Sequence, residues 1–214
     1  MNILLLSPSL KPRITGISFR YNNILKYLSI NNNIYLCGYD KNFHNNIPNK
    51  NIKCYYLPNI SLPSDHYQRV FNIFLFIPSL FYCFYIIKKN KIDILHIAGP
   101  DMSNIMWVIL KYLTKTKLIY AYHTDITSYL KNRNIIYNNF IIRNLIKYND
   151  KIIIDNCDLF YVMSNSIKYK LNTYYNLTKV NTKVMHFGID REIFYKNNNN
   201  SLQHLWNKNK LKLL

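Results

Sequence analysis

Short apolar runs alternate with longer amphipathic segments along most of the chain. Continuous apolar runs bounded by turn residues predict strands that are buried on both faces of a sheet, whereas apolar residues repeating every three to four positions predict helices. The predicted strands are Ile3–Leu6, Ile34–Cys37, Ile52–Leu57, Ile92–Ala98, Lys117–Tyr122, Leu159–Met163 and Lys183–Phe187. The predicted helices are Phe19–Ile30, Met102–Leu113, a long segment from about Asn134 to Asp155, and Ser164–Tyr174 with an N-cap at Ser164 or Asn165. This alternation predicts an α/β fold, a Rossmann-like doubly wound parallel sheet with helices on both faces.

The segment Val70–Ile87 is the most apolar part of the chain and carries no formal charge. At about 18 residues it just reaches the length that spans a bilayer. Asn72, Pro78 and Ser79 weaken that interpretation. We expect a buried helix with one face on the sheet and another near lipid, and a transmembrane helix is the alternative.

The balance of charge is strongly basic, with a net charge of +18. Such a surface favours anionic partners. The basic residues are dispersed, however, and the sequence has no arginine-rich stripe with interleaved aromatic residues of the kind that tracks a nucleic acid. We therefore expect a membrane surface rather than nucleic acid, and we attribute much of the excess to a compositional bias. A peripheral membrane or cytoplasmic location is expected, because Met1 leads directly into the first strand without a signal or transit segment.

Several kinds of chemistry are not supported by the sequence. The four cysteines form no CxxC pair, which predicts buried, reduced thiols in a reducing compartment. The motifs GxGxxG and GxxxxGKS or GxxxxGKT do not occur, so neither a nicotinamide enzyme nor a P-loop site is indicated. We expect no metal site, because His123 and Asp125 have no third ligand at a suitable spacing. His96 and His186 lie within predicted strands and are interpreted as structural.

The turns at the carboxyl ends of parallel strands meet at one edge of such a sheet, where ligands bind. This places three loops together: Ser7–Gly16, Gly99–Asp101 and His123–Asp125. Gly16 precedes a helix, so it either lets the backbone approach a ligand closely or serves only as a turn residue. His123 either hydrogen-bonds a substrate or is a core or rim histidine whose hydrogen bonds are made within the protein.

Five segments carry a resemblance to a known family. They are ILLLSPSLKPRITGISFRYNNILKYL, DILHIAGP, AYHTDITSYL, CDLFYVMSNSIKYKL and FGIDREIF. They occur in family order and at family spacing between residues 2 and 195. On these segments the chain resembles the family-4 retaining glycosyltransferases of the GT-B fold. Within that family it is most similar to the sulfoquinovosyltransferases of plant and cyanobacterial sulfolipid synthesis.

The resemblance implies two Rossmann-like domains that face each other across a cleft. The first binds the acceptor and the second binds the nucleotide sugar. It divides this chain into an acceptor-side domain, residues 1–195, and a linker with the start of a donor-binding domain, residues 196–214. The implied reaction needs no cofactor and transfers a sugar from UDP-sulfoquinovose or a UDP-hexose to a lipid such as diacylglycerol. A plastid location would accompany the sulfolipid version.

The resemblance also implies roles for individual residues. His123 matches the histidine that contacts the transferred sugar and is the candidate catalytic residue. Thr15 and Gly16 match the loop under the donor phosphates, where Thr15 replaces the first of two common glycines. Arg20 matches the basic residue of the first helix. Gly99 and Asp125 complete the predicted substrate-binding set. The predicted hinge residues are Gly188, Asp190 and Phe194.

Retaining transfer needs positive charge or helix N-termini beside the departing diphosphate. The Glu-x7-Glu motif and the phosphate-binding basic residues of the donor domain do not occur in this chain. We therefore expect the 214-residue chain to be inactive by itself. The alternative to a transferase is a non-catalytic Rossmann-like module that binds a membrane or a partner chain.

Overall fold

The computed structural model describes residues 1–7, 16–38, 51–58, 76–99, 104–123, 140–177 and 182–186. Within these residues the strands are β1 (Asn2–Leu6), β2 (Asn33–Gly38), β3 (Lys53–Tyr56), β4 (Ile94–Ala98), β5 (Lys117–Tyr122), β6 (Leu159–Val162) and β7 (Thr182–Val184). The helices are α1 (Gly16–Leu28), α3 (Phe76–Lys89), α4 (Asn104–Thr114), α6 (Phe140–Asn156) and α7 (Asn165–Tyr175).

The strands form one parallel sheet in the order β3-β2-β1-β4-β5-β6-β7. The chain moves outward from β1 to β3, returns to place β4 beside β1, and then moves outward in the other direction. The strand order therefore reverses between β1 and β4, which is the position where open α/β sheets bind ligands. The predicted fold class, a Rossmann-like doubly wound parallel sheet, is confirmed.

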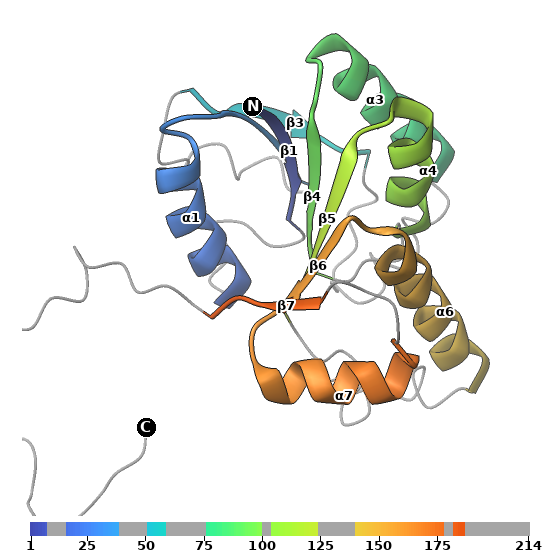
Figure 1. Ribbon diagram of the computed structural model, residues 1–214. Coiled ribbons are helices and arrows are strands. Elements are labelled where there is room, and N and C mark those ends of the chain that lie inside the picture. The colour runs from blue at the N-terminus through green and yellow to red at the C-terminus, as the bar shows by residue number, and fades with distance from the viewer. Residues whose placement is uncertain are drawn as a thin grey trace, which may run out of the picture.

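Helices cover both faces of the sheet, with α1 on one side and α3, α4 and α6 on the other (Figure 1). Alternate residues of β1 pack into the cores on the two faces of the sheet. Ile3 and Leu5 belong to the core under α1, whereas Leu4 and Leu6 belong to the larger core under the other helices. Burial on both faces explains why this strand is a continuous apolar run rather than an alternating one.

The apolar segment predicted at Val70–Ile87 appears in the structure as α3, and residues 70–75 lie outside the described part. Cys83, Ile86 and Ile87 are fully buried in the larger core, while the opposite face of α3 is exposed. This confirms the expected helix with one face on the sheet. Among the described helices, none has the length and apolar character that crossing a membrane requires.

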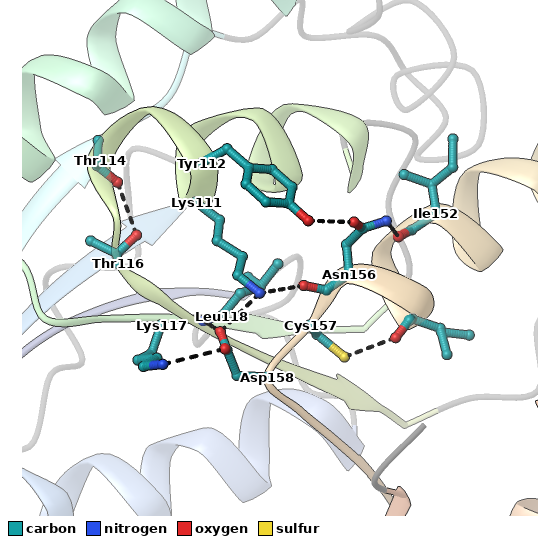
Figure 2. A network of polar contacts seen from close by, with 11 residues as sticks. Lys111, Tyr112, Thr114, Thr116, Lys117, Leu118, Ile152, Asn156, Cys157 and Asp158 are labelled. Atoms are coloured by element: carbon teal, nitrogen blue, oxygen red, sulfur yellow. Dashed lines mark hydrogen bonds and ion pairs between the residues drawn. The ribbon is translucent and has the colours of Figure 1, made fainter. Parts of the chain in front are cut away.

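A network of polar contacts ties α4 and α6 together at the amino ends of β5 and β6 (Figure 2). The Asp158 carboxylate accepts hydrogen bonds from the Leu118 backbone N–H at 2.8 Å and forms an ion pair with Lys111 at 3.1 Å. Lys111 also donates to the backbone carbonyl of Asn156 at 2.5 Å. Burial pushes the pKa of Asp158 upward, but these donors outweigh it and hold that pKa below its usual value. This edge is thus fixed by structural contacts.

Two details at the end of the sheet differ from or sharpen the prediction. Ser164 is the N-cap of α7, with its hydroxyl accepting from the Ile167 N–H at 3.2 Å. The prediction of a strand over Lys183–Phe187 was too long, because β7 pairs only with β6 and ends at Val184, opposite Val162. His186 is therefore exposed beyond the strand, and its interpretation as a strand residue was wrong.

All four cysteines are free. Cys37 and Cys83 are fully buried, whereas Cys54 and Cys157 are half-buried. Burial raises the pKa of the Cys54 thiol to about 11 and that of Cys157 to about 12. Raised pKa values make Cys54 and Cys157 poor nucleophiles. The prediction of buried thiols holds for Cys37 and Cys83 and only in part for Cys54 and Cys157.

Candidate functional site

The site lies at the carboxyl edge of the sheet, where β1, β4, β5 and β6 run side by side in the same direction. Gly99 follows β4 and His123 follows β5, so both residues lie at this edge. The Gly99 N–H donates to the Ala121 carbonyl of the neighbouring strand at 2.7 Å. Two of the three predicted loops therefore begin next to each other.

Helix α1 brings polar side chains onto the same face of the sheet. Its buried residues are Ser18, Arg20, Tyr21 and Leu25. Ser18, Tyr21 and Leu25 are spaced three and four positions apart, which places them on one side of a helix. Leu25 packs into the small apolar core formed with β1 and β2. Tyr21, one turn earlier, reaches His96 in β4 and His123, the residue that follows β5.

Four aromatic residues form what we call the tyrosine–histidine cluster: Tyr21, His96, His123 and Tyr161. The Tyr21 hydroxyl lies 2.8 Å from Nε2 of His123, and the Tyr161 hydroxyl lies 2.9 Å from Nε2 of His96. Two longer contacts join the pairs, from the Tyr21 hydroxyl to His96 Nε2 at 3.2 Å and to the Tyr161 hydroxyl at 3.3 Å. Tyr21 and both histidines meet edge to face, with ring centroids 5.6 Å and 5.2 Å apart. The cluster links α1, β4, β5 and β6 at one point.

Both histidines of the cluster are held in the neutral form. Burial, followed by the positive charge of Arg20, lowers the pKa of His96 to about 4. Burial, Arg20 and then His96 lower the pKa of His123 to about 3. Burial also raises the pKa of both Tyr21 and Tyr161, so the two phenols stay protonated. At neutral pH the cluster is therefore uncharged.

One ring nitrogen in the cluster stands out. Nδ1 of His123 is buried, and no described residue offers it a hydrogen-bond partner. A buried polar atom without a partner is costly, typically about 1–3 kcal/mol. Its position at the carboxyl edge of a parallel sheet, where ligands of such sheets bind, makes this nitrogen a candidate ligand contact.

Arg20 supplies the positive charge beside this site. Its side chain is 8% exposed, and its guanidinium carbon lies 5.7 Å from the centre of the Tyr161 ring. One guanidinium nitrogen donates to the sulfur of Met163, the residue that follows β6. The arginine predicted as a ligand contact thus lies against the tyrosine–histidine cluster.

Residues 41–193 match the family model of Glycosyltransferase Family 4. The chain belongs to this family.

Solved structures agree on the fold of this family 4 chain. It is similar to sucrose-phosphate synthase from Thermosynechococcus elongatus, with 14% identity, a TM-score of 0.70, and 95% of this chain covered against 52% of the other. A glycosyltransferase from Rickettsia africae ESF-5 gives 17% identity and a TM-score of 0.61, with 95% and 48% covered. Anabaena HepE in complex with UDP and glucose has 15% identity and a TM-score of 0.54. The match covers 96% of this chain and 50% of HepE. The chain thus spans about half the length of these structures. No curated protein matches it in sequence.

The other predicted site residues of this family 4 chain have mixed outcomes. Gly16 is the first residue of α1 and is exposed, and a Cβ built on it meets no atom within 4 Å. Gly99 is buried with φ of 89°, a conformation that favours glycine. Five predicted residues lie outside the described part of the chain: Thr15, Asp125, Gly188, Asp190 and Phe194. The described residues contain no group of three or more side chains that could hold a metal ion.

Sequence reasoning missed Tyr21 and Tyr161, and it treated His96 as a structural residue separate from the site. A signal was present in the side-chain alternation of the strands. His96 and Ala98 of β4 lie on one face of the sheet. Ala121 pairs with Ala98, so Ala121 and His123, two positions later, lie on that same face. A polar residue two positions from a strand end, on the same face as a candidate ligand contact, marks such a cluster. Which residue of α1 contacts the cluster depends on the rotation of the helix about its axis, which the sequence pattern did not fix.

Proposed function

We propose that this family 4 chain is the acceptor-side half of a retaining glycosyltransferase that moves a sugar from a UDP-linked donor to a lipid acceptor. The observation that carries the proposal is the buried Nδ1 of His123, without a described partner, at the carboxyl edge of the sheet and near Arg20. A sugar hydroxyl or phosphate oxygen is a suitable partner for such a nitrogen. Residues 1–195 form this half, and residues 196–214 lead toward a donor-binding domain.

The structural neighbours support the choice of donor. HepE was solved with UDP and glucose, and a UGT transferase from Siraitia grosvenorii, at 12% identity and a TM-score of 0.51, was solved with UDP. In the proposed function, His123 contacts the transferred sugar, and Thr15 with Gly16 lies under the donor phosphates. Arg20, Gly99 and Asp125 line the substrate cleft. The proposed hinge residues are Gly188, Asp190 and Phe194.

The exposed face of α3 supports a lipid acceptor. Ile77, Phe81 and Tyr85 recur every four residues and are 63%, 68% and 53% exposed. Lys88 and Lys89 follow in the last turn of the same helix. An apolar stripe with basic residues at its end fits a bilayer that contains anionic lipid, and the net charge of +18 adds long-range attraction. Diacylglycerol as acceptor and UDP-sulfoquinovose as donor are the most specific version of the proposal.

Vesicle binding tests the membrane part of the proposal. The chain should sediment with vesicles of phosphatidylglycerol more than with vesicles of phosphatidylcholine. The combined change Ile77→Ser, Phe81→Ser and Tyr85→Ser should lower this binding several-fold, because it removes the apolar stripe. The matched control is Tyr169→Ser on α7, where the tyrosine is 77% exposed. Equal binding by the α3 variant would contradict a role of this face at the membrane.

A transfer assay tests the activity itself. UDP-glucose, UDP-galactose and UDP-sulfoquinovose are each incubated with diacylglycerol vesicles, once with the complete gene product and once with the 214-residue chain. We expect glycolipid from the complete gene product and none from the 214-residue chain, since the chain spans about half of the structures it resembles. Vesicle binding without glycolipid from the complete gene product would favour the non-catalytic module. Glycolipid from the 214-residue chain would contradict the need for a second domain.

A further inference from the structure

We infer that Tyr21 is a positioning residue that fixes the tautomer of His123. In this tautomer Nδ1 of His123 carries the hydrogen and donates a hydrogen bond to an oxygen of the bound ligand. This inference rests on the proposed function for the identity of the ligand. The state of the imidazole in the free protein does not depend on it. The evidence is the pattern of distances in the tyrosine–histidine cluster.

Two short contacts and two long ones define that pattern. Each short contact joins one phenol to one imidazole: Tyr21 to His123 at 2.8 Å and Tyr161 to His96 at 2.9 Å. The contacts that cross between the pairs, both from Tyr21, are longer, at 3.2 Å and 3.3 Å. Four groups therefore divide into two bonded pairs.

Proton counting assigns a donor to each pair. Each phenol has one hydrogen, and each neutral imidazole has one protonated nitrogen and one bare nitrogen. A phenol is the stronger acid and a bare imidazole nitrogen is the stronger acceptor, so the favoured arrangement has each tyrosine donating to Nε2. Both phenol hydrogens are then used in the short contacts, which explains why the crossing contacts are longer. Both histidines consequently carry their proton on Nδ1.

The alternative tautomer, with the proton on Nε2 of His123, fits the contact distances less well. If Nε2 of His123 carried the proton, it would donate to Tyr21, and the Tyr21 hydroxyl would have to use one of the longer contacts. Protonation of both nitrogens is opposed by burial and by Arg20, which lower the pKa of His123 to about 3. The neutral form with a proton on Nδ1 is left, and this atom has no partner in the described part of the chain. It is a fixed donor directed at a ligand oxygen.

Tyr21 is suited to hold this state because it cannot move away easily. Its side chain is fully buried. Its helix is anchored one turn later by Leu25 in the core with β1 and β2. The ring also meets His123 edge to face, with an interplanar angle of 85°. A positioning residue needs this rigidity, since a small misplacement of the imidazole weakens catalysis.

Nitrogen NMR of ¹⁵N-histidine-labelled protein tests the inference without any ligand. Protonated and bare imidazole nitrogens have distinct ¹⁵N shifts, and the His123→Gln and His96→Gln variants assign the signals. We expect Nδ1 protonated and Nε2 bare in His123 of the wild-type chain. Tyr21→Phe should move the His123 nitrogens toward the average of two tautomers. A proton on Nε2 in the wild type, which is readable even if the variant does not fold, would overturn the inference.

Two tyrosine controls separate this effect from general loosening. Tyr27→Phe, on the same helix with its tyrosine 52% exposed, should leave both histidines unchanged. Tyr161→Phe should shift the nitrogens of His96 and leave the protonation of His123 as it is. Unchanged His123 shifts in Tyr21→Phe, or equal changes in all three variants, would overturn the assignment to Tyr21.

Kinetics of the complete gene product tests the second half of the inference. Tyr21→Phe should lower kcat about tenfold with a smaller change in KM, because the donor is misplaced while the ligand still binds. A perturbation of His123 by UDP-glucose alone indicates a sugar oxygen as acceptor, and one by UDP as well indicates a phosphate oxygen. Wild-type kcat in Tyr21→Phe, or no perturbation by either ligand, would overturn the positioning role. A gene product that transfers no sugar would refute the proposed function, and the nitrogen shifts would still decide the tautomer.

Discussion

The hydroxyl of Tyr21 and Nε2 of His123 lie 2.8 Å apart although 102 residues separate them in the sequence. The contact joins the first helix of the chain to the end of β5, across the position where the strand order reverses. It therefore ties α1 to the carboxyl edge of the sheet near the position where ligands of such sheets bind. The buried side chain of Arg20 and the unpartnered Nδ1 of His123 belong to the same part of the sheet edge.

Acid should destabilise the protein through the two buried histidines. An unfolded histidine has a pKa near 6.5, whereas His96 and His123 have folded pKa values of about 4 and about 3. Between these limits the unfolded chain binds more protons, so stability is complete above pH 6.5 and falls as the pH drops toward 4. Each histidine contributes a slope of about 1.4 kcal/mol per pH unit in that window.

Urea unfolding at pH 7, 6 and 5 measures this slope. The His96→Gln and His123→Gln double variant should lose less stability between pH 7 and pH 5 than the wild type, and the exposed His186→Gln should behave like the wild type. Identical pH profiles for the wild type and the double variant would show that the two histidines are not held neutral.

Gly16→Val should separate ligand contact from folding. A Cβ at Gly16 meets no atom within 4 Å, so a valine there has space in the free protein. We expect a change in the unfolding free energy of less than about 1 kcal/mol, since valine is not worse than glycine in a helix. Transfer activity should nevertheless fall by at least an order of magnitude, because the branched side chain fills the approach to the donor phosphates. Full activity in this variant would remove Gly16 from the site.

Asp158→Asn should destabilise the fold without touching the site. The carboxylate accepts from the Leu118 N–H and pairs with Lys111 at the amino edge of the sheet, away from the carboxyl edge. Its side chain is 31% exposed, so we expect a loss of about 1–2 kcal/mol in the unfolding free energy and an unchanged KM. Asp155→Asn is the matched control, because its pair with Lys151 is largely solvent-exposed and worth only about 0.5 kcal/mol. Equal losses in the two variants would contradict the structural role of Asp158.

The sequence predicted the sheet well because its strands are buried on both faces. β5 was predicted with its observed limits, Lys117–Tyr122, since a continuous apolar run between polar residues has few other interpretations. Helix α1 was expected to begin at Phe19 but begins at Gly16, and Ile17 already packs against the core. Ile17 continues the spacing of Tyr21, Ile24 and Leu28 by one further turn, so the sequence did carry a signal for this part of the helix.

The site was only partly predictable for a different reason. His123 stood out as a polar residue at a strand end, and Arg20 was implied by the family resemblance. Tyr21 did not, because a tyrosine in an amphipathic helix is most often a core residue. Its role depends on the strand order, which brings β4 and β6 beside β5, and on the rotation of α1 about its axis. Neither is encoded in a local pattern.

The most direct test of the account is the turnover of His123→Ala in the complete gene product, measured beside its thermal stability. We predict that kcat falls by at least about a hundredfold, because the variant loses the proposed hydrogen bond from His123 to the ligand, while the unfolding free energy changes by no more than about 1–2 kcal/mol. His96→Ala, in the same cluster but without the ligand-facing nitrogen, should lose stability more than turnover. Wild-type turnover in His123→Ala, or a loss of turnover no greater than its loss of folded protein, would contradict the assignment of His123 to the transfer site.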